Sequence, residues 1–168
     1  MAKYAEGTNV SIATSRTEIE RTLYRYGVTG FLYGEQGDRA AVAFELQGRR
    51  YRMELRYPPI SEFEYTSRNV RRSSTSQKTA YDGELRRLWR GLVMIIKAKL
   101  EAVESGVTTL EDELMMHTVM PDNSTVSEWL SPQINEIYQS GRMPPLLPWV
   151  RSGKKALEGP ILEGEVIS

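Results

Sequence analysis

The sequence predicts an α+β fold: an N-terminal helix, a three-stranded antiparallel meander, a long helix packed on the sheet and a small C-terminal helical appendage. Apolar residues recur at helical spacing in residues 15–27 and again in 79–106. Between these two segments they alternate at strand spacing, and short turn sequences containing Gly separate the strands. Because one face of such a meander must be covered, the long helix is expected to lie across it.

The first helix is predicted over residues 15–27, after an irregular lead-in over 1–14. Ser15 and Glu18 have the spacing of a capping box, and Gly27 suits the left-handed position that ends a helix. The buried face of this helix is expected to carry Ile19, Leu23 and Tyr26.

Three strands are predicted over residues 28–34, 39–47 and 49–58. Alternation is clear in the second and third strands, so one face is expected on the core and the other in water. The core face is expected to carry Val42, Phe44 and Leu46 of the second strand and Tyr51, Met53, Leu55 and Tyr57 of the third. Opposite them on the third strand stand Arg50, Arg52, Glu54 and Arg56.

The polar, Ser- and Arg-rich connector over residues 60–79 has poor periodicity, and its order is doubtful. Thr79 is expected to start the long helix and Gly106 to end it. Gly91, inside this helix, would allow close approach of a neighbouring element. The apolar stripe of the helix consists of Leu85, Leu88, Trp89, Leu92, Ile95, Ile96, Leu100 and Val103.

The C-terminal part is divided by caps and prolines. Thr108 is expected to cap a short helix that reaches His117, residues 120–125 form a turn, and Thr125 with Glu128 starts a further helix. Pro132 is expected to break that helix, with Ser131 recapping it and Gly141 ending it. The predicted organisation is thus a lead-in over 1–14, an α-β-β-β-α core over 15–106, a helical appendage with a Pro-rich docking segment over 107–150 (the docking residues being 143–150), and a mobile tail over 151–168.

Composition excludes several classes of protein. The 168 residues include no Cys and a single His, so disulfides, thiolate nucleophiles, cysteine zinc sites and multi-histidine metal sites are excluded. The longest apolar run is residues 92–96, far short of a membrane helix, and residues 1–10 lack the apolar core of a signal peptide. We therefore expect a soluble, cytoplasmic protein without a membrane partner.

Charge is unevenly distributed along a chain whose 22 basic and 22 acidic residues cancel. Residues 40–100 carry 13 basic and 6 acidic side chains, a net of +7, whereas residues 101–168 carry 4 and 11, a net of −7. Such asymmetry indicates a partner for the basic part. The plain alternative is that the two parts face each other in the fold.

The basic side chains are the strongest candidate site, because guanidinium groups are permanently charged and match the geometry of phosphates. A loop rich in Arg and Ser beside a basic strand suits a clamp on a nucleic-acid backbone, and Tyr65 is placed for base stacking. A solvated basic face is the competing interpretation. The candidate nucleic-acid-binding residues are Arg50, Arg52, Arg56, Arg68, Arg71, Arg72, Lys78, Arg86, Arg87, Arg90 and Lys97.

No catalytic, metal or cofactor site is expected. His117 has no local nucleophile or orienting partner, so a packed or helix-capping role is favoured. Glu111, Asp112 and Glu113 could offer oxygens to a cation, but consecutive helical positions diverge, and an acidic first turn mainly complements the helix dipole. Phosphate-loop, Rossmann, kinase and hydrolase motifs are absent from the sequence, which favours a protein that is not an enzyme.

Two stretches, "SRTEIERTLYRYGVTGFLYGEQGDRAAVAFELQGRRYRMEL" and "LRRLWRGLVMIIKAKLEAVESGVTTLEDE…PDNSTVSEWLSPQI", together resemble a family of small uncharacterised proteins of tailed phages and prophages. The resemblance covers most of residues 10–148 and implies the cytoplasm of an infected or lysogenic bacterial host, but no activity. In element order alone the chain is also similar to double-stranded-RNA-binding domains and to the core of phage single-strand annealing proteins.

The leading hypothesis is a non-enzymatic phage accessory protein that binds nucleic acid through a basic strand, loop and helix edge, in phage DNA metabolism or recombination. The alternative is a protein-interaction module with a host or phage protein partner, such as an inhibitor of a host enzyme or defence system. Its binding surface would be the apolar helix, the Met-rich segment 114–120 and the acidic C-terminal part. Self-association as a homo-oligomer through the same surfaces is left open.

Overall fold

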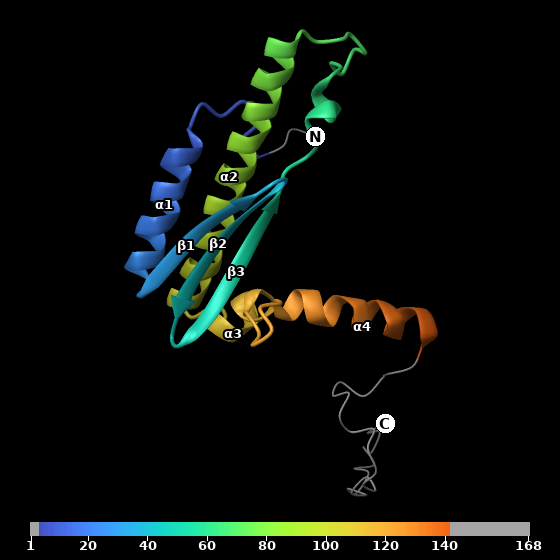
Figure 1. Ribbon diagram of the computed structural model, residues 1–168. Coiled ribbons are helices and arrows are strands. Elements are labelled where there is room, and N and C mark those ends of the chain that lie inside the picture. The colour runs from blue at the N-terminus through green and yellow to red at the C-terminus, as the bar shows by residue number, and fades with distance from the viewer. Residues whose placement is uncertain (1–3, 142–168) are drawn as a thin grey trace, which may run out of the picture. The chain divides into compact units, whose positions relative to one another are not determined.

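The computed structural model describes residues 4–141, and the α+β fold is as predicted (Figure 1). The elements in chain order are α1 (Ile12–Arg25), β1 (Gly30–Gln36), β2 (Arg39–Leu46), β3 (Arg49–Arg56), η1 (Ile60–Phe63), α2 (Ser74–Glu104), α3 (Leu110–Leu114), η2 (Met115–His117) and α4 (Val126–Ser140). The chain divides into two compact units, Met1–Leu130 and Ser131–Ser168. Everything that follows up to α4 belongs to the first unit.

Helix α1 begins earlier than predicted, because Ser11 rather than Ser15 is its N-cap. The Ser11 side chain accepts a hydrogen bond from the Thr14 N–H at 3.0 Å. Ser15 is fully buried within the helix and donates to the Ser11 carbonyl, so the predicted capping box of Ser15 and Glu18 is wrong. The buried face is as predicted at Ile19 and Leu23, while Tyr26 is half-buried, and Gly27 has a φ of +82° beyond the C-cap.

The three strands form one antiparallel sheet in the order β1-β2-β3. Gln47 and Gly48 both have positive φ in the turn between β2 and β3, the conformation that tight hairpins require. The expected core face is confirmed, with Leu55 only partly buried. Its buried members are Val42, Phe44, Leu46, Tyr51, Met53 and Tyr57.

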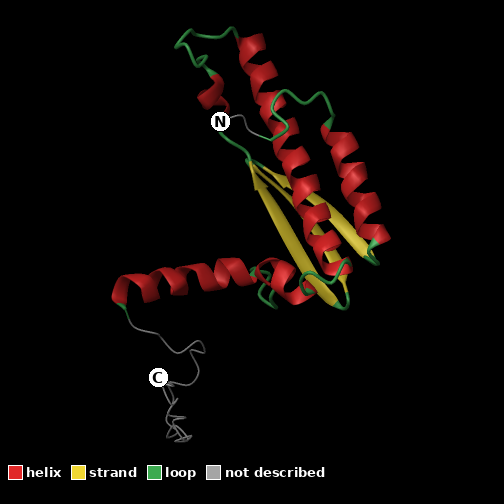
Figure 2. Cartoon of the chain, turned by 180° about the vertical axis from the view of Figure 1, so that it is seen from behind, coloured by secondary structure: helices red, strands yellow, loops and turns green. Residues whose placement is uncertain are grey.

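Helices α1 and α2 cover the same face of the sheet, as Figures 1 and 2 show from opposite sides. Trp89, near the middle of α2, is completely buried, and its indole N–H donates to the Tyr57 hydroxyl at 2.9 Å. The Tyr57 hydroxyl in turn donates to Glu35 at 2.8 Å. Burial, and then the bond to Glu35, raises the pKa of Tyr57 to about 12, so this hydroxyl keeps its proton.

The predicted apolar stripe of α2 is largely confirmed, with two corrections. Ile95 is 49% exposed, and Val93 is buried in its place. An added Cβ at Gly91 would meet nothing within 4 Å, so the expected close approach of a neighbour is absent among the described residues. The stripe residues that are buried are Trp89, Leu92, Ile96 and Leu100, with Leu85, Leu88 and Val103 partly buried.

Helix α2 also starts earlier than predicted, at Ser74 instead of Thr79. Ser73 is the N-cap, since its side chain accepts a hydrogen bond from the Ser76 N–H at 3.2 Å. The N-terminal part of α2 therefore extends past the end of the sheet, with η1 and a loop beside it (Figure 1). We call residues 58–81 the arm, and the rest of the first unit from Ser11 onward the body.

The segment after α2 packs on the body through α3, η2 and a short bridge. Thr109, not Thr108, caps α3, accepting a hydrogen bond from the Asp112 N–H at 3.1 Å. Thr118 forms an isolated antiparallel bridge with Tyr51, and the Val119 N–H donates to the Arg50 carbonyl. This contact extends the open edge of β3.

Helix α4 is started by the capping box that the sequence predicts. The Thr125 N–H donates to Glu128 at 2.6 Å, and the Glu128 N–H donates to the Thr125 hydroxyl at 3.2 Å. The expected break at Pro132 and recapping by Ser131 are wrong, because α4 continues through Pro132 to Ser140. Pro132 lacks the N–H that would bond the Glu128 carbonyl, yet the helix is continuous across it.

Gly141 follows the helix with a φ of +64°, as expected. The predicted docking segment 143–150 and tail 151–168 lie outside the described residues. Within the described residues, the structure contains no helix long and apolar enough to cross a membrane.

Candidate nucleic-acid interface

The three candidate arginines of β3 do not form one basic surface. Arg52 is held by the body: it donates to the Asn123 carbonyl and to Glu128, each at 2.8 Å, and forms a second ion pair with Glu54. Arg50 and Arg56 are exposed and form no ion pair with another described residue. They are six residues apart, about 20 Å along a strand. The Arg52 ion pairs lie between them, so the strand offers two separate cations.

The candidate cations in the middle of α2, Arg90 and Lys97, are bound to a carboxylate of the same protein. Glu18 of α1 accepts hydrogen bonds from both Arg90 and Lys97. These two bonds lower the pKa of Glu18 below its usual 4.5, that from Lys97 contributing most. The basic edge of the helix therefore joins α2 to α1.

The two arginines one turn earlier on α2 are also held. Arg87 forms a two-pronged ion pair with Glu84, at 2.6 and 2.8 Å, and Arg86 donates to the Thr8 carbonyl at 3.3 Å. Three further ion pairs link the basic middle to the acidic C-terminal part: Arg49–Glu111, Arg52–Glu128 and Lys99–Glu113. Part of the basic middle is thus paired with acidic residues of the segment after α2.

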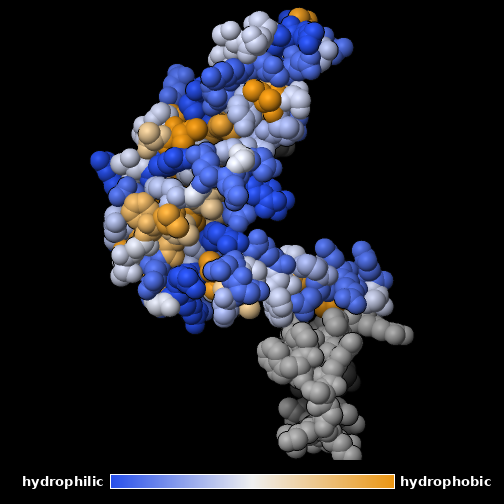
Figure 3. Space-filling model, in the orientation of Figure 1, coloured by the Kyte–Doolittle hydropathy of each residue, from blue (hydrophilic) through white to orange (hydrophobic). Residues whose placement is uncertain are grey.

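The arm differs from the middle of α2, because most of its cations remain exposed to solvent. Residues 65–81 contain four cations and no Asp or Glu. Arg68 and Lys78 are exposed and form no ion pair with another described residue. Arg71 forms one ion pair, with Glu64 at 2.8 Å, while its side chain remains 73% exposed. The surface at this end of the arm is largely hydrophilic (Figure 3).

The connector that seemed irregular in the sequence contains a small ordered hairpin, residues 64–72. Tyr65 and Arg71 pair across it in an antiparallel bridge, and the Thr66 N–H donates to the Val70 carbonyl at 2.9 Å. The Arg72 side chain stabilises the hairpin, since its Nη1 donates to the carbonyls of Phe63 and Tyr65. The doubtful order expected for this connector is therefore wrong.

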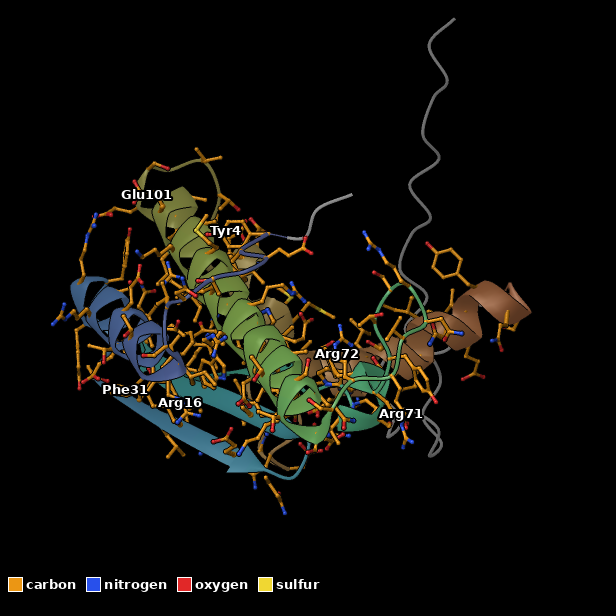
Figure 4. The ribbon with its side chains drawn as sticks, turned by 90° about the horizontal axis from the view of Figure 1, so that it is seen from above. Tyr4, Arg16, Phe31, Arg71, Arg72 and Glu101 are labelled. Atoms are coloured by element: carbon orange, nitrogen blue, oxygen red, sulfur yellow. The ribbon has the colours of Figure 1, made fainter. Side chains whose placement is uncertain are left out.

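Arg71 and Arg72 are neighbours with different roles, and both are labelled in Figure 4. The guanidinium of Arg72 is bound to backbone carbonyls and helps to fix the loop. The guanidinium of Arg71 projects into solvent apart from its contact with Glu64. Of the eleven candidate residues, Arg68, Arg71 and Lys78 belong to the arm and are exposed to solvent, and Arg56 lies just before the arm begins.

The residues considered for a metal or catalytic site, Glu111, Asp112, Glu113 and His117, make structural contacts or are partly buried. Glu111 pairs with Arg49 and Glu113 with Lys99, while the Asp112 carboxylate accepts from the Thr109 cap. Within the described residues no group of three His, Cys, Asp or Glu side chains could hold a metal ion. Burial, and then the nearby Lys99, lowers the pKa of His117, so this half-buried ring is neutral near pH 7.

Several apolar side chains on the first unit remain exposed. On α2, Met94 and Ile95 face solvent, and on the uncovered face of the sheet Leu32 is 65% exposed. Gly30, Gly34, Ala41 and Ala43 share that uncovered face with Leu32, which follows from the strand register. Figure 3 shows a small apolar patch over the sheet within a hydrophilic surround.

Sequence reasoning missed the carboxylates that bind the basic residues, above all Glu18, Glu64 and Glu128. Glu18 and Glu128 were read only as capping residues, although Glu128 caps α4 and binds Arg52 at once. Nothing in the sequence marks Glu18, which is 72 residues from Arg90. Comparison of the chain with family models, with curated proteins and with solved structures found no match.

Proposed function

We propose that the protein binds nucleic acid through the end of the arm, without catalysing a reaction. One observation carries the proposal: three of the four cations of residues 65–81, Arg68, Arg71 and Lys78, are exposed beside an ordered hairpin. Most candidate cations of the body make internal contacts instead, namely Arg52, Arg86, Arg87, Arg90 and Lys97. Permanently charged guanidinium groups on a projecting element can reach phosphates without first breaking contacts that hold the core.

The exposed ion pair of Arg71 and Glu64 does not prevent this role. Exposed ion pairs contribute little free energy, typically less than about 1 kcal/mol, so Arg71 can exchange its carboxylate for a phosphate. The first turn of α2 contains no acidic residue, which leaves its positive helix end without competing charge. A phage setting, with a role in DNA metabolism or recombination, belongs to the same proposal.

The test is a salt titration of oligonucleotide binding by fluorescence anisotropy. The arm variant replaces Arg68, Arg71 and Lys78 with Gln. The control replaces Arg21, Arg25 and Arg49 with Gln, which removes the same charge from exposed positions of the body. Each lost phosphate contact lowers the magnitude of the slope of log K against log salt by about 0.7–0.9, so loss of three contacts should lower it by about 2–3.

The control variant should keep the slope of the unaltered protein within about 0.5. Equal losses in both variants would indicate a diffuse charge effect and contradict a site on the arm. Absence of binding to single- and double-stranded DNA and RNA at low salt would refute the function itself.

A protein-interaction module is the second candidate, favoured by the exposed apolar side chains. Met94 and Ile95 form an exposed apolar surface on a helix whose opposite face is the core. Replacing both with Gln should abolish capture of a protein partner from nuclease-treated host lysate if this surface is an interface. Unchanged capture by that variant would exclude the surface.

A further inference from the structure

The hairpin carries an aromatic residue and an arginine at directly opposed positions. Tyr65 and Arg71 are directly opposed in an antiparallel bridge, so both side chains leave the same face of the hairpin. Directly opposed residues have Cβ atoms about 5 Å apart. The Tyr65 side chain is 48% exposed and makes no ring contact with another described aromatic residue.

Phe63, only two residues earlier, shows what an aromatic side chain of the arm does when its role is structural. Its ring packs edge-on against Tyr81 of α2, with centroids 5.7 Å apart. That pair holds η1 against the helix. Tyr65 makes no such ring contact with a described residue, and about half of its surface faces solvent.

The hairpin is fixed before any ligand arrives. The Asn69 N–H donates to the Thr66 carbonyl at 2.9 Å, the Val70 N–H donates to the Thr66 hydroxyl at 3.1 Å, and Asn69 takes a φ of +59° to close the turn. At the open end of the hairpin, the Arg72 N–H donates to the Glu64 carbonyl at 2.8 Å. Because these bonds order the loop, little conformational entropy remains to be lost when a ligand binds.

A ring next to a guanidinium matches the two parts of one nucleotide. A base with a free face can stack on the ring, and the phosphate beside it can accept from the guanidinium. In a duplex the bases are stacked on each other, so an exposed ring finds no free base face and only the phosphates are available. A single strand offers both an unpaired base with a free face and the phosphate beside it.

We infer that the hairpin binds single-stranded nucleic acid, with Tyr65 stacking on an unpaired base and Arg71 contacting the adjacent phosphate. This inference rests on the proposed function and specifies the class of nucleic acid. Arg68, at the turn of the same hairpin, then contacts a further phosphate of the strand. Glu64 forms an ion pair with Arg71 in the free protein, and the phosphate replaces it on binding.

The test compares a 15-nucleotide single strand with the duplex of the same sequence, at one salt concentration, by fluorescence anisotropy on the full chain. Tyr65→Ala should weaken single-strand binding about 10-fold and change duplex binding less than 2-fold. Tyr65→Phe keeps the ring and should stay within about 2-fold for both ligands. Tyr24→Ala removes a similarly exposed ring, 53% accessible, from α1 and should change neither.

Thermal unfolding of each variant establishes that it is folded. Because Tyr65 is at an exposed position, Tyr65→Ala should leave the midpoint temperature of unfolding unchanged. Equal weakening of single-strand and duplex binding, or no change in either, would overturn the single-strand inference. If the triple replacement of Arg68, Arg71 and Lys78 still lowered the salt slope in that case, nucleic-acid binding by the arm would stand. Absence of all binding would overturn both proposals.

Discussion

In the body, cations from distant parts of the chain meet carboxylates and carbonyls, whereas at the end of the arm they face solvent. Arg90 and Lys97 converge on Glu18, and Arg52 lies between Glu54 and Glu128. Arg68 and Lys78 form no ion pair with any other described residue. The comparison shows that the number of basic residues in a segment says little about the charge it presents, because folding determines which are used internally.

Replacing Trp89 with Ala should have the largest effect on stability, since it empties the centre of the body. The ring is fully buried and its N–H is bonded to Tyr57. Loss of a buried aromatic side chain costs about 3–5 kcal/mol of unfolding free energy. Chemical denaturation measures this loss, and Val70→Ala on the arm, where the side chain is exposed, should cost less than about 0.5 kcal/mol.

Replacing Glu18 with Gln should have the next largest effect, because two cations of α2 lose their shared acceptor. A cost of about 1–2 kcal/mol is expected for weakening hydrogen bonds to charged groups at a partly exposed position. Glu20→Gln on the same helix is the control, since Glu20 forms no ion pair with a described residue. An equal effect of the two replacements would show that Glu18 contributes only its general charge.

The cost of Glu18→Gln should also depend on pH in a defined direction. The pKa of Glu18 is lowered in the folded protein by its bonds to Lys97 and Arg90, so the carboxylate stabilises the fold above the unfolded value of 4.5. That contribution is lost as the pH falls through the folded pKa. The difference in unfolding free energy between the two proteins should therefore be constant from about pH 8 to pH 6 and shrink below about pH 4.5.

Replacing Arg72 with Ala should loosen the hairpin while leaving the body intact. Two carbonyls lose their donor, which costs about 1–2 kcal/mol, but only the arm is affected. Amide hydrogen exchange should become faster at residues 64–72 and stay unchanged in the sheet. Arg71→Ala removes the adjacent, exposed guanidinium and should leave both exchange rates unchanged.

The sequence predicted the order and type of the elements because burial patterns are local. Alternation in β2 and β3 and the stripe from Trp89 to Leu100 each follow from one buried face. Helix starts were less predictable, since Ser11 and Ser73 compete with Ser15 and Thr79 as plausible caps. Packing of the whole chain decides between such neighbouring caps.

The candidate site was only partly predictable for a different physical reason. The chemistry of Arg68 and Arg71 is visible in the sequence, but the distant partner that occupies Arg90 is not. The hairpin was also hidden, because side-chain bonds from Arg72 to carbonyls order it and leave no periodic pattern. Three-dimensional contacts were needed to separate the cations of the arm from those of the body.

The most direct test of this division is an NMR titration of the 15N-labelled chain with the single-stranded oligonucleotide. The largest amide shifts should fall on residues 64–72 and around Lys78, with small shifts at Arg90, Lys97 and the core strands. Shifts centred on Arg50, Arg52 and the uncovered face of the sheet, with the hairpin unchanged, would contradict the account and place the binding surface on the body.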